Sequence, residues 1–157
     1  MNAFRTKPMT YPWPPLLFGL SAATALMLDM RYPLPVADTG GLLARAIGFT
    51  LVVSAIAMDL WAIKTLIERK TAVLPHHCTR HLVTCGPFAL TRNPIYLGYT
   101  LLLAGVGLID GNAWCFVMAI LFVALTSLYA IHQEEQHLLS RFGIDFERYS
   151  RRTARWI

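Results

Sequence analysis

The chain has 157 residues, of which 55% are hydrophobic and 15% are charged. Because a soluble domain usually carries about 25% charged residues, this composition argues against a soluble globular protein. The formal net charge is +5, but the basic residues flank apolar segments instead of forming a stripe. We therefore expect a lipid bilayer with anionic lipid at its surface, and no nucleic acid, as the partner.

Four apolar segments approach the roughly 20 residues that a helix needs to cross a bilayer. They cover residues 15–30, 42–63, 94–109 and 113–131. Between the last two, Asp110-Gly111-Asn112 is a turn signal, which predicts an antiparallel helical hairpin. We predict an all-α integral membrane protein with four transmembrane helices. A single domain then covers residues 1–157, with the first two spans within 1–70 and the remainder within 71–157.

Lys and Arg are concentrated in the cytoplasmic loops of membrane proteins. In this chain they gather before the first predicted span, between the second and third, and after the fourth: Arg5, Lys7, Lys64, Arg69, Lys70, Arg80, Arg92, Arg141, Arg148, Arg151, Arg152 and Arg155. This distribution predicts that both termini lie in the cytoplasm. The loop 76–93 and the tail then lie on one side of the membrane, so we expect them to converge at the ends of the third and fourth spans.

Local signals predict how the third span begins. Gly86-Pro87 predicts a turn, Asn93 is a suitable N-cap, and Pro94 suits the first helical position, where its missing N–H is not needed. The free backbone N–H groups and the positive end of the helix dipole suit an anion, such as the carboxylate of an amino-acid-like ligand. Phe88 and Tyr96 are candidate walls for a flat ring.

An acidic pair, Glu134-Glu135, directly follows the fourth predicted span. Two adjacent carboxylates at a membrane boundary are costly unless they are solvated or partnered. A cationic ligand, such as a sulfonium or an ammonium group, is one suitable partner, and a solvated helix end is the alternative. The tail from Arg141 to Trp156 then alternates aromatic and basic residues, as a segment lying at an interface does.

At these residues the chain resembles the membrane methyltransferases related to isoprenylcysteine carboxyl methyltransferase and to phospholipid methyltransferases. The matching segments are Leu82-Val-Thr-Cys-Gly-Pro-Phe88, Arg92-Asn-Pro-Ile-Tyr-Leu-Gly98, Glu134-Glu-Gln-His-Leu138, Phe142-Gly143, Phe146 and Tyr149. An upstream Thr71-Ala-Val-Leu-Pro75 is similar to a segment of many bacterial members. The resemblance covers about Thr71 to Trp156, over half of the chain. It implies methyl transfer from S-adenosylmethionine to a lipophilic small molecule or a lipid, at the cytoplasmic face of a bacterial inner membrane.

The resemblance also implies roles for individual residues. Cofactor binding is expected of Arg80, His81, Leu82, Val83, Gly86, Phe88, Asn93, Pro94, Tyr96, Glu134 and Glu135. Side-chain chemistry, and not the resemblance, suggests catalytic roles for two more residues: Arg92, which would orient this region, and His132, which would accept a proton from an amine or thiol acceptor. Isoprenylcysteine enzymes carry a basic residue about one turn before the acidic pair, where this chain has Ala130. This departure argues against a prenylcysteine substrate.

Two other functional classes remain open. One is a haem- or metal-binding membrane protein that uses the scattered ligand-type residues His76, His77, Cys78, His81, Cys85, His132 and His137. Their spacing is irregular, so we predict no metal site. The other is a non-catalytic membrane scaffold that retains only the cofactor pocket. Arg92 alone is typical of a snorkelling interface residue, and Tyr96 alone is typical of an aromatic belt.

Small and acidic residues inside the predicted spans have structural and functional interpretations. Gly105 and Gly107 are typical of close helix packing. Asp59 is an intramembrane acid, which by default suggests a function. It lies near the cytoplasmic end of its span, where pairing with Lys64 or contact with water is the alternative.

Overall fold

The computed structural model describes residues 13–36, 41–69 and 82–157. Its α-helices are α1 (Trp13–Arg31), α2 (Leu42–Glu68), α3 (Pro94–Asp110), α4 (Ala113–Leu125), α5 (His132–Phe142) and α6 (Ile144–Arg152). A short 3-10 helix, η1 (Gly86–Ala89), precedes α3, and a π-helical turn, η2 (Thr126–Ile131), joins α4 to α5. The described residues contain no strand, so the all-α prediction is confirmed for them.

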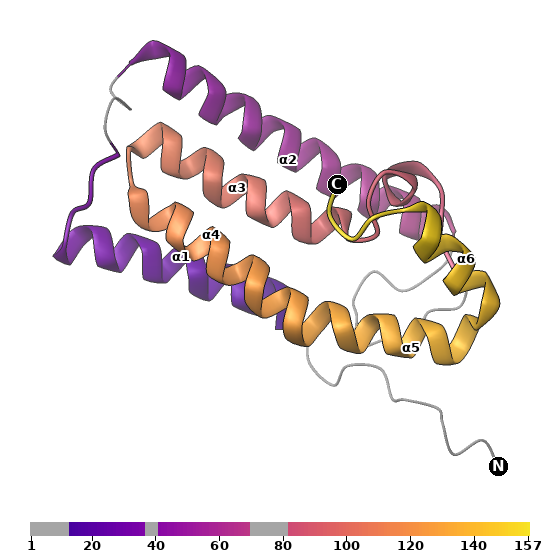
Figure 1. The fold of residues 1–157 in the computed structure, drawn as a ribbon. Helices are drawn as coiled ribbons and strands as arrows, with labels where there is room; N and C mark the ends of the chain where they lie inside the picture. Colours follow the sequence, from indigo (N-terminus) through magenta and orange to yellow (C-terminus); the bar gives the residue numbers. More distant parts are fainter. Residues whose placement is uncertain (1–12, 37–40, 70–81) are drawn as a thin grey trace.

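Helices α1 to α4 run alongside one another, with α3 between α2 and α4 and with α1 against α4 (Figure 1). Helices α5 and α6 extend beyond one end of this body, and the C-terminal segment returns from α6 towards the start of α3. In the described part of the chain, two helices are long and apolar enough to cross a membrane: α2 and the continuous helix Ala113–Phe142. Helix α3 is shorter but also apolar.

The fourth helix does not end where the apolar segment ends. It continues past residue 131 through η2 into α5. The Thr126 hydroxyl donates to the carbonyls of Phe122 at 2.6 Å and Val123 at 3.2 Å. A π-turn of this kind changes the direction in which the following side chains point, and it occurs often at functional sites.

The predicted hairpin between α3 and α4 is confirmed. Gly111 adopts a left-handed conformation with φ of 72°, which ends α3. Asn112 then caps α4, because its side-chain oxygen accepts from the N–H of Trp114 at 2.9 Å. Its amide nitrogen donates to the Ala25 carbonyl at 3.4 Å, so the same side chain also fixes α1.

Glycines allow α2, α3 and α4 to approach closely. A Cβ at Gly48 would lie 2.8 Å from the carbonyl oxygen of Gly105, and one at Gly105 would lie 2.8 Å from Val52 Cγ2. A Cβ at Gly107 would lie 2.9 Å from Cys115 Cβ in α4. The predicted close packing at Gly105 and Gly107 is therefore confirmed.

Gly98 leaves room for the carboxyl group of Asp59, which a Cβ at this position would overlap. Lys64 pairs with Glu68 at 3.9 Å and not with Asp59. Among the described residues, the Asp59 Oδ1 atom has no hydrogen-bond partner. Asp59 therefore fills the contact between α2 and α3 without an ion pair to Lys64.

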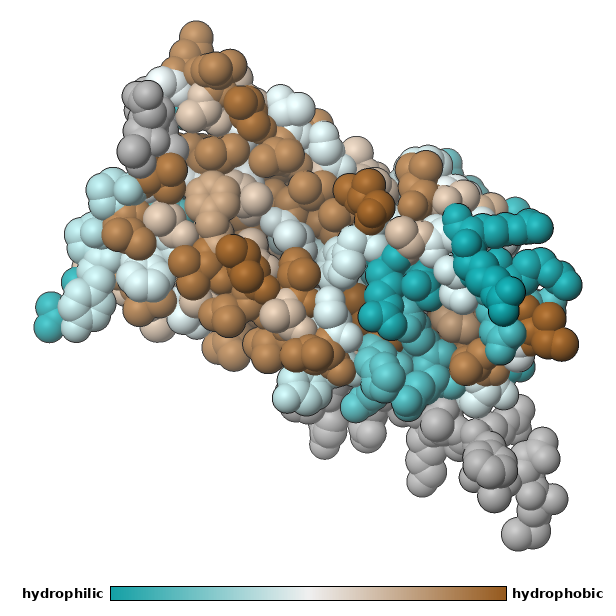
Figure 2. All heavy atoms as spheres, in the orientation of Figure 1, coloured by the Kyte–Doolittle hydropathy of each residue, from teal (hydrophilic) through white to brown (hydrophobic). Residues whose placement is uncertain are grey.

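The outer surface of the helical body is apolar. Figure 2 shows hydrophobic residues over the body and hydrophilic residues gathered near α5 and α6. Large exposed apolar side chains on α1, α2, α4 and η2 include Leu20, Met27, Leu42, Val53, Leu60, Ile120 and Leu128. An apolar surface of this extent is unfavourable in water but suits the hydrocarbon of a bilayer. This surface and the two long apolar helices are those of a membrane protein.

Candidate functional site

The loop before α3 is held against the end of α2. Gly86, with φ of 62°, faces the side chains of Trp61 and Thr65, where a Cβ would lie 3.0 Å from Thr65 Oγ1. Pro87 is buried, and its carbonyl accepts from the N–H groups of Leu90 and Thr91, both at 3.1 Å. The turn predicted at Gly86-Pro87 is confirmed as η1. Leu82 and Val83, which precede η1, are half-buried.

Asn93 occupies the N-cap position of α3, but its side chain does not cap the helix. Its amide nitrogen donates instead to the Arg155 carbonyl at 3.0 Å. The Thr91 hydroxyl donates to the same carbonyl at 2.8 Å, and the Arg92 N–H donates to the Ala154 carbonyl at 2.9 Å. The predicted N-cap position of Asn93 is confirmed, but the side chain is held by the tail carbonyl and its oxygen caps no N–H of α3. Pro94 opens α3 as predicted.

Glu135 joins the loop, α5 and the tail. Its carboxylate lies 2.9 Å from Arg92 Nη1, and it binds Arg155 through two contacts, from Nε at 2.9 Å and from Nη2 at 2.6 Å. The Arg92 and Glu135 side chains are 14% and 17% exposed, so solvent screens this pair weakly. Hydrogen bonding to Glu135 raises the pKa of Arg155 above its usual value. Glu135 therefore has charged partners within the protein.

Glu134 faces a different part of the molecule. Adjacent residues of an α-helix point about 100° apart, since one turn takes 3.6 residues. The Tyr96 hydroxyl donates to Glu134 Oε2 at 3.3 Å, which links α3 to α5. Tyr96 itself is 7% exposed and belongs to the core cluster with Phe122 and Ile131. The two carboxylates are therefore separated: Glu135 contacts arginines, and Glu134 contacts a core tyrosine.

Two aromatic side chains fix α6 against the loop. The Tyr149 hydroxyl donates to the Phe88 carbonyl at 2.6 Å, and burial raises the pKa of Tyr149 above its usual value. Phe146 is 5% exposed and makes an edge contact with Tyr149, with ring centroids 6.3 Å apart. Trp156 of the tail packs against the core cluster. The loop, α6 and the tail thus form one layer over the ends of α3 and α4.

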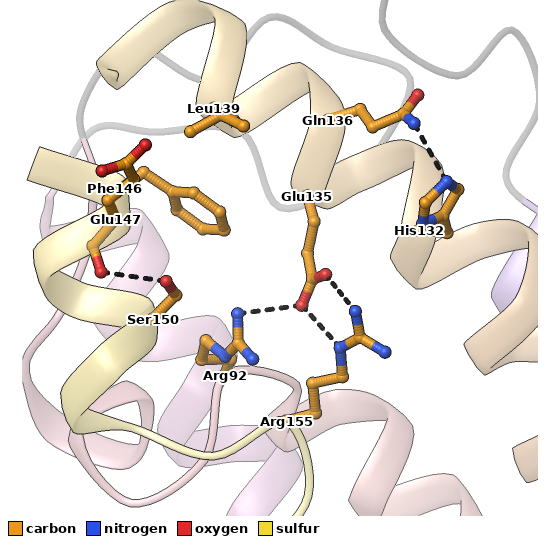
Figure 3. Close-up of a pocket in the computed structure, with 9 residues that line it drawn as sticks. All are labelled: Arg92, His132, Glu135, Gln136, Leu139, Phe146, Glu147, Ser150 and Arg155. Atoms are coloured by element: carbon orange, nitrogen blue, oxygen red, sulfur yellow. Dashed lines mark hydrogen bonds and ion pairs between the residues drawn. The ribbon is translucent and has the colours of Figure 1, made fainter. Parts of the chain in front are cut away.

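A cavity of about 390 Å³ lies between α5, α6, the loop and the tail. Figure 3 shows the side chains that line it, which are Arg92, His132, Glu135, Gln136, Leu139, Phe146, Glu147, Ser150 and Arg155. Both expected catalytic residues, Arg92 and His132, and one expected cofactor residue, Glu135, meet here. Tyr96 and Glu134 do not line it, and His132 is exposed with its Nε2 atom 2.9 Å from Gln136 Nε2.

Sequence reasoning did not assign six of the nine lining residues. Four of them, Phe146, Glu147, Ser150 and Arg155, come from α6 and the tail. The Phe142-Gly143 pair after the acidic pair could have predicted the turn into α6, because Gly143 with φ of 51° ends α5 and starts α6. Arg80 and His81 lie outside the described residues.

No group of three or more His, Cys, Asp or Glu side chains that could hold a metal ion occurs within residues 13–36, 41–69 and 82–157. His76, His77, Cys78 and His81 lie outside those ranges. Cys85 and Cys115 are free thiols.

Comparison with known proteins identifies the family. The family model described as phospholipid methyltransferase matches residues 43–145. The chain belongs to the phospholipid methyltransferase family. The matched part of this family member runs from α2 to the first residues of α6, and it includes the loop, the hairpin and the acidic pair. The methyltransferase resemblance of the loop and the acidic pair is therefore confirmed.

Two relatives of this phospholipid methyltransferase family member are similar to parts of the chain. The nickel-cobalt-cadmium resistance protein NccN of Alcaligenes xylosoxydans xylosoxydans is 32% identical over 108 residues, which are 68% of this chain and 46% of that protein. An uncharacterized protein of Haemophilus influenzae is 32% identical over 63 residues, which are 40% of this chain and 100% of that protein. The chain spans about half the length of NccN. No solved structure matches the chain.

Proposed function

We propose that this family member transfers a methyl group from S-adenosylmethionine to an apolar or membrane-embedded acceptor. The observation that carries the proposal is the cavity of about 390 Å³ at the polar end of an apolar helical body, lined by Arg92, His132 and Glu135. Cavities for small ligands measure about 300–1,000 Å³ and combine apolar walls with a few polar groups. The family membership supports the reaction class.

The chemistry of the lining residues fits such a cofactor. Arg155 binds Glu135 through Nε and Nη2, and its Nη1 group, on a side chain that is 44% exposed, suits a ligand carboxylate. Leu139 and Phe146 supply apolar surface for an aromatic base. Glu134, half-buried beside Tyr96, is a carboxylate suited to a cation at the junction with the helical body. When bound, the cofactor supplies an electrophilic methyl group on a sulfonium.

The residues of this chain then align the reactants and exclude water. In an in-line displacement, the sulfonium S–C bond breaks and a bond from the acceptor to the methyl carbon forms, so catalysis depends mainly on position. Arg92 and Glu135 fix the loop relative to α5. A neutral amine or thiol acceptor must lose a proton during the reaction, and His132, which is exposed at the cavity, accepts it.

Four helices, α1 to α4, cross the membrane in this proposal, with the cavity on the cytoplasmic side. The side-by-side arrangement of these helices supports it (Figure 1). The polar end near α5 and α6 carries exposed Arg148, Arg151 and Arg152, and Lys and Arg favour the cytoplasm. The acceptor enters from the bilayer between helices.

The acceptor is an amine, a thiol or an aminophospholipid. A carboxylate acceptor needs a fixed cation, and Ala130, which is 2% exposed, stands where isoprenylcysteine enzymes carry a basic residue. The protein in nanodiscs should methylate apolar amines and thiols faster than a farnesylated cysteine analogue. The rate should rise with pH, and His132→Ala should lower the rate more than it lowers cofactor affinity. Fast, pH-independent ester formation on the prenylcysteine analogue would contradict this acceptor class.

The same preparation separates the two rival functional classes. An absorbance spectrum of the purified protein would reveal haem directly. Cofactor binding without turnover on a broad acceptor panel would favour a non-catalytic scaffold.

A further inference from the structure

Helix α6 folds back beside α5 and closes one side of the cavity. Gly143, with φ of 51°, reverses the chain, and α6 then presents Phe146, Glu147 and Ser150 to the cavity. Phe146 and Ser150 are four residues apart and share one face of the helix, and Glu147, the residue after Phe146, also lines the cavity. In Figure 3 they lie across the cavity from His132 and Gln136. The family match ends at residue 145, before the three α6 residues that line the cavity.

The two acidic residues of the cavity have different surroundings. Glu135 is bound by two arginines. The Glu147 side chain is exposed and has no hydrogen bond or ion pair with other described residues. Arg148, the next residue, pairs with Asp145 at 3.6 Å instead. The Ser150 hydroxyl donates to the backbone carbonyl of Glu147, not to its carboxylate. Glu147 is therefore the cavity acid that is available to a ligand.

The side chains beside Glu147 in the cavity lining are apolar. The edge contact with Tyr149 holds the Phe146 ring, and Leu139 of α5, which is 43% exposed, lies on the same side of the cavity. The guanidinium groups of Arg92 and Arg155 lie at the other side, around Glu135 (Figure 3). The cavity thus has a cationic end and an end that combines apolar surface with a carboxylate.

A nucleoside fits the end of the cavity that combines apolar surface with a carboxylate. The two hydroxyls of a ribose donate hydrogen bonds to one carboxylate, as acidic residues accept them from the ribose of dinucleotides. An adenine ring packs against flat or branched apolar side chains. We propose that α6 forms the nucleoside subsite of the cofactor, in which Glu147 binds the ribose hydroxyls and Phe146 and Leu139 contact the base. The amino-acid end then faces the arginines. This inference rests on the proposed function.

A plain helix-end role for Glu147 makes a different prediction. Acidic residues in the first turn of a helix are favourable because of the helix dipole, and Asp145 shares that turn. If Glu147 acts only on the helix dipole, Glu147→Gln and Asp145→Asn should change ligand affinity by the same amount. A ribose role concerns Glu147 alone and depends on the hydroxyls of the ligand.

Calorimetry in nanodiscs tests the subsite with two probes, S-adenosylhomocysteine and its 2′-deoxy analogue. Glu147→Gln should weaken binding of the first probe about tenfold, since hydrogen bonds to a charged group are stronger than neutral ones. It should weaken binding of the deoxy analogue much less, and Asp145→Asn should leave both affinities unchanged. Thermal unfolding of both variants should match the parent.

Equal losses for both probes, or an equal loss in Asp145→Asn, would overturn the ribose contact while the proposed methyl transfer stands. Failure of the unmodified protein to bind either probe would overturn the proposed function and the subsite together, whereas binding without methylation of any acceptor would overturn the methyl transfer alone.

Discussion

Arg155 binds both carboxylate oxygens of Glu135, with Nε 2.9 Å from Oε1 and Nη2 2.6 Å from Oε2. This contact joins the tail to α5, and through Arg92 it also joins the loop before α3. A guanidinium that binds a carboxylate through two parallel hydrogen bonds fixes geometry as well as charge. Glu135 thereby holds α5, the loop and the tail together around the cavity.

The first prediction concerns the tail. Arg155→Gln removes the two-point contact, so the tail carbonyl of Ala154 should leave the Arg92 N–H more often. We expect faster hydrogen exchange at the Arg92 amide and a loss of less than about 1 kcal/mol of unfolding free energy, because Arg155 is partly exposed. Arg151→Gln, at an exposed position with no ion pair among the described residues, is the control. Unchanged exchange in Arg155→Gln would contradict the anchoring role.

The second prediction distinguishes the role of Glu134 from that of Glu135. Glu135→Ala leaves the guanidinium of Arg92, 14% exposed, without its carboxylate partner, so unfolding free energy should fall by about 1–3 kcal/mol. Glu134 lies outside the cavity lining, at the junction with the helical body where the proposed function places the sulfonium. Glu134→Ala should therefore cost less stability but weaken S-adenosylmethionine binding by about one to two orders of magnitude. Thermal unfolding and calorimetry on both variants measure these effects. Full cofactor affinity in Glu134→Ala would remove Glu134 from the site.

A third prediction concerns the contact between α2 and α3. Gly48→Ala places a Cβ 2.8 Å from the backbone oxygen of Gly105, which has no flexible end to move aside. The helices must separate, at a cost of about 1–3 kcal/mol. Gly19→Ala is a matched control in α1, because nothing lies within 4 Å of its Cβ. Equal unfolding midpoints for the two variants would contradict the close approach.

The fourth prediction is a dependence on alkaline pH. Burial raises the pKa of Tyr149, whose hydroxyl donates to Phe88. An unfolded tyrosine ionises near pH 10, so the contribution of Tyr149 to stability is complete below about pH 10 and is lost as pH rises through its raised native pKa. Unfolding free energy should fall more steeply above pH 10 in the parent than in Tyr149→Phe. Identical slopes would contradict a buried, protonated Tyr149.

Local and periodic signals in the sequence predict much of the helical body. Apolar length predicts four helices close to their observed bounds, and the turn at Gly111 follows from residues within the turn itself. The end of α4 was not predictable in this way, because its helix continues through η2 into the polar α5. The end of an apolar segment predicts where a span leaves the membrane. It does not predict where the helix ends, because backbone hydrogen bonds can continue into polar residues.

The site depended on contacts that local signals do not contain. Asn93 stands at the N-cap position of α3, but its side chain is held by a carbonyl 62 residues later and does not cap the helix. Glu134 and Glu135 are neighbours in sequence, yet their helix directs them to Tyr96 and to Arg155. The α6 wall with Glu147 forms only when Gly143 reverses the chain. Contacts between distant segments, set by tertiary packing, decide these roles.

Methyl transfer itself tests the central claim most directly. Purified protein in nanodiscs made from native lipid extract is incubated with S-adenosylmethionine that carries a labelled methyl group, and the lipid products are separated and identified. We predict label in an amine- or thiol-bearing lipophilic product, and a marked loss of label with Glu134→Ala. Absence of label in every lipid and small-molecule fraction, with the protein folded and the cofactor in excess, would contradict the account.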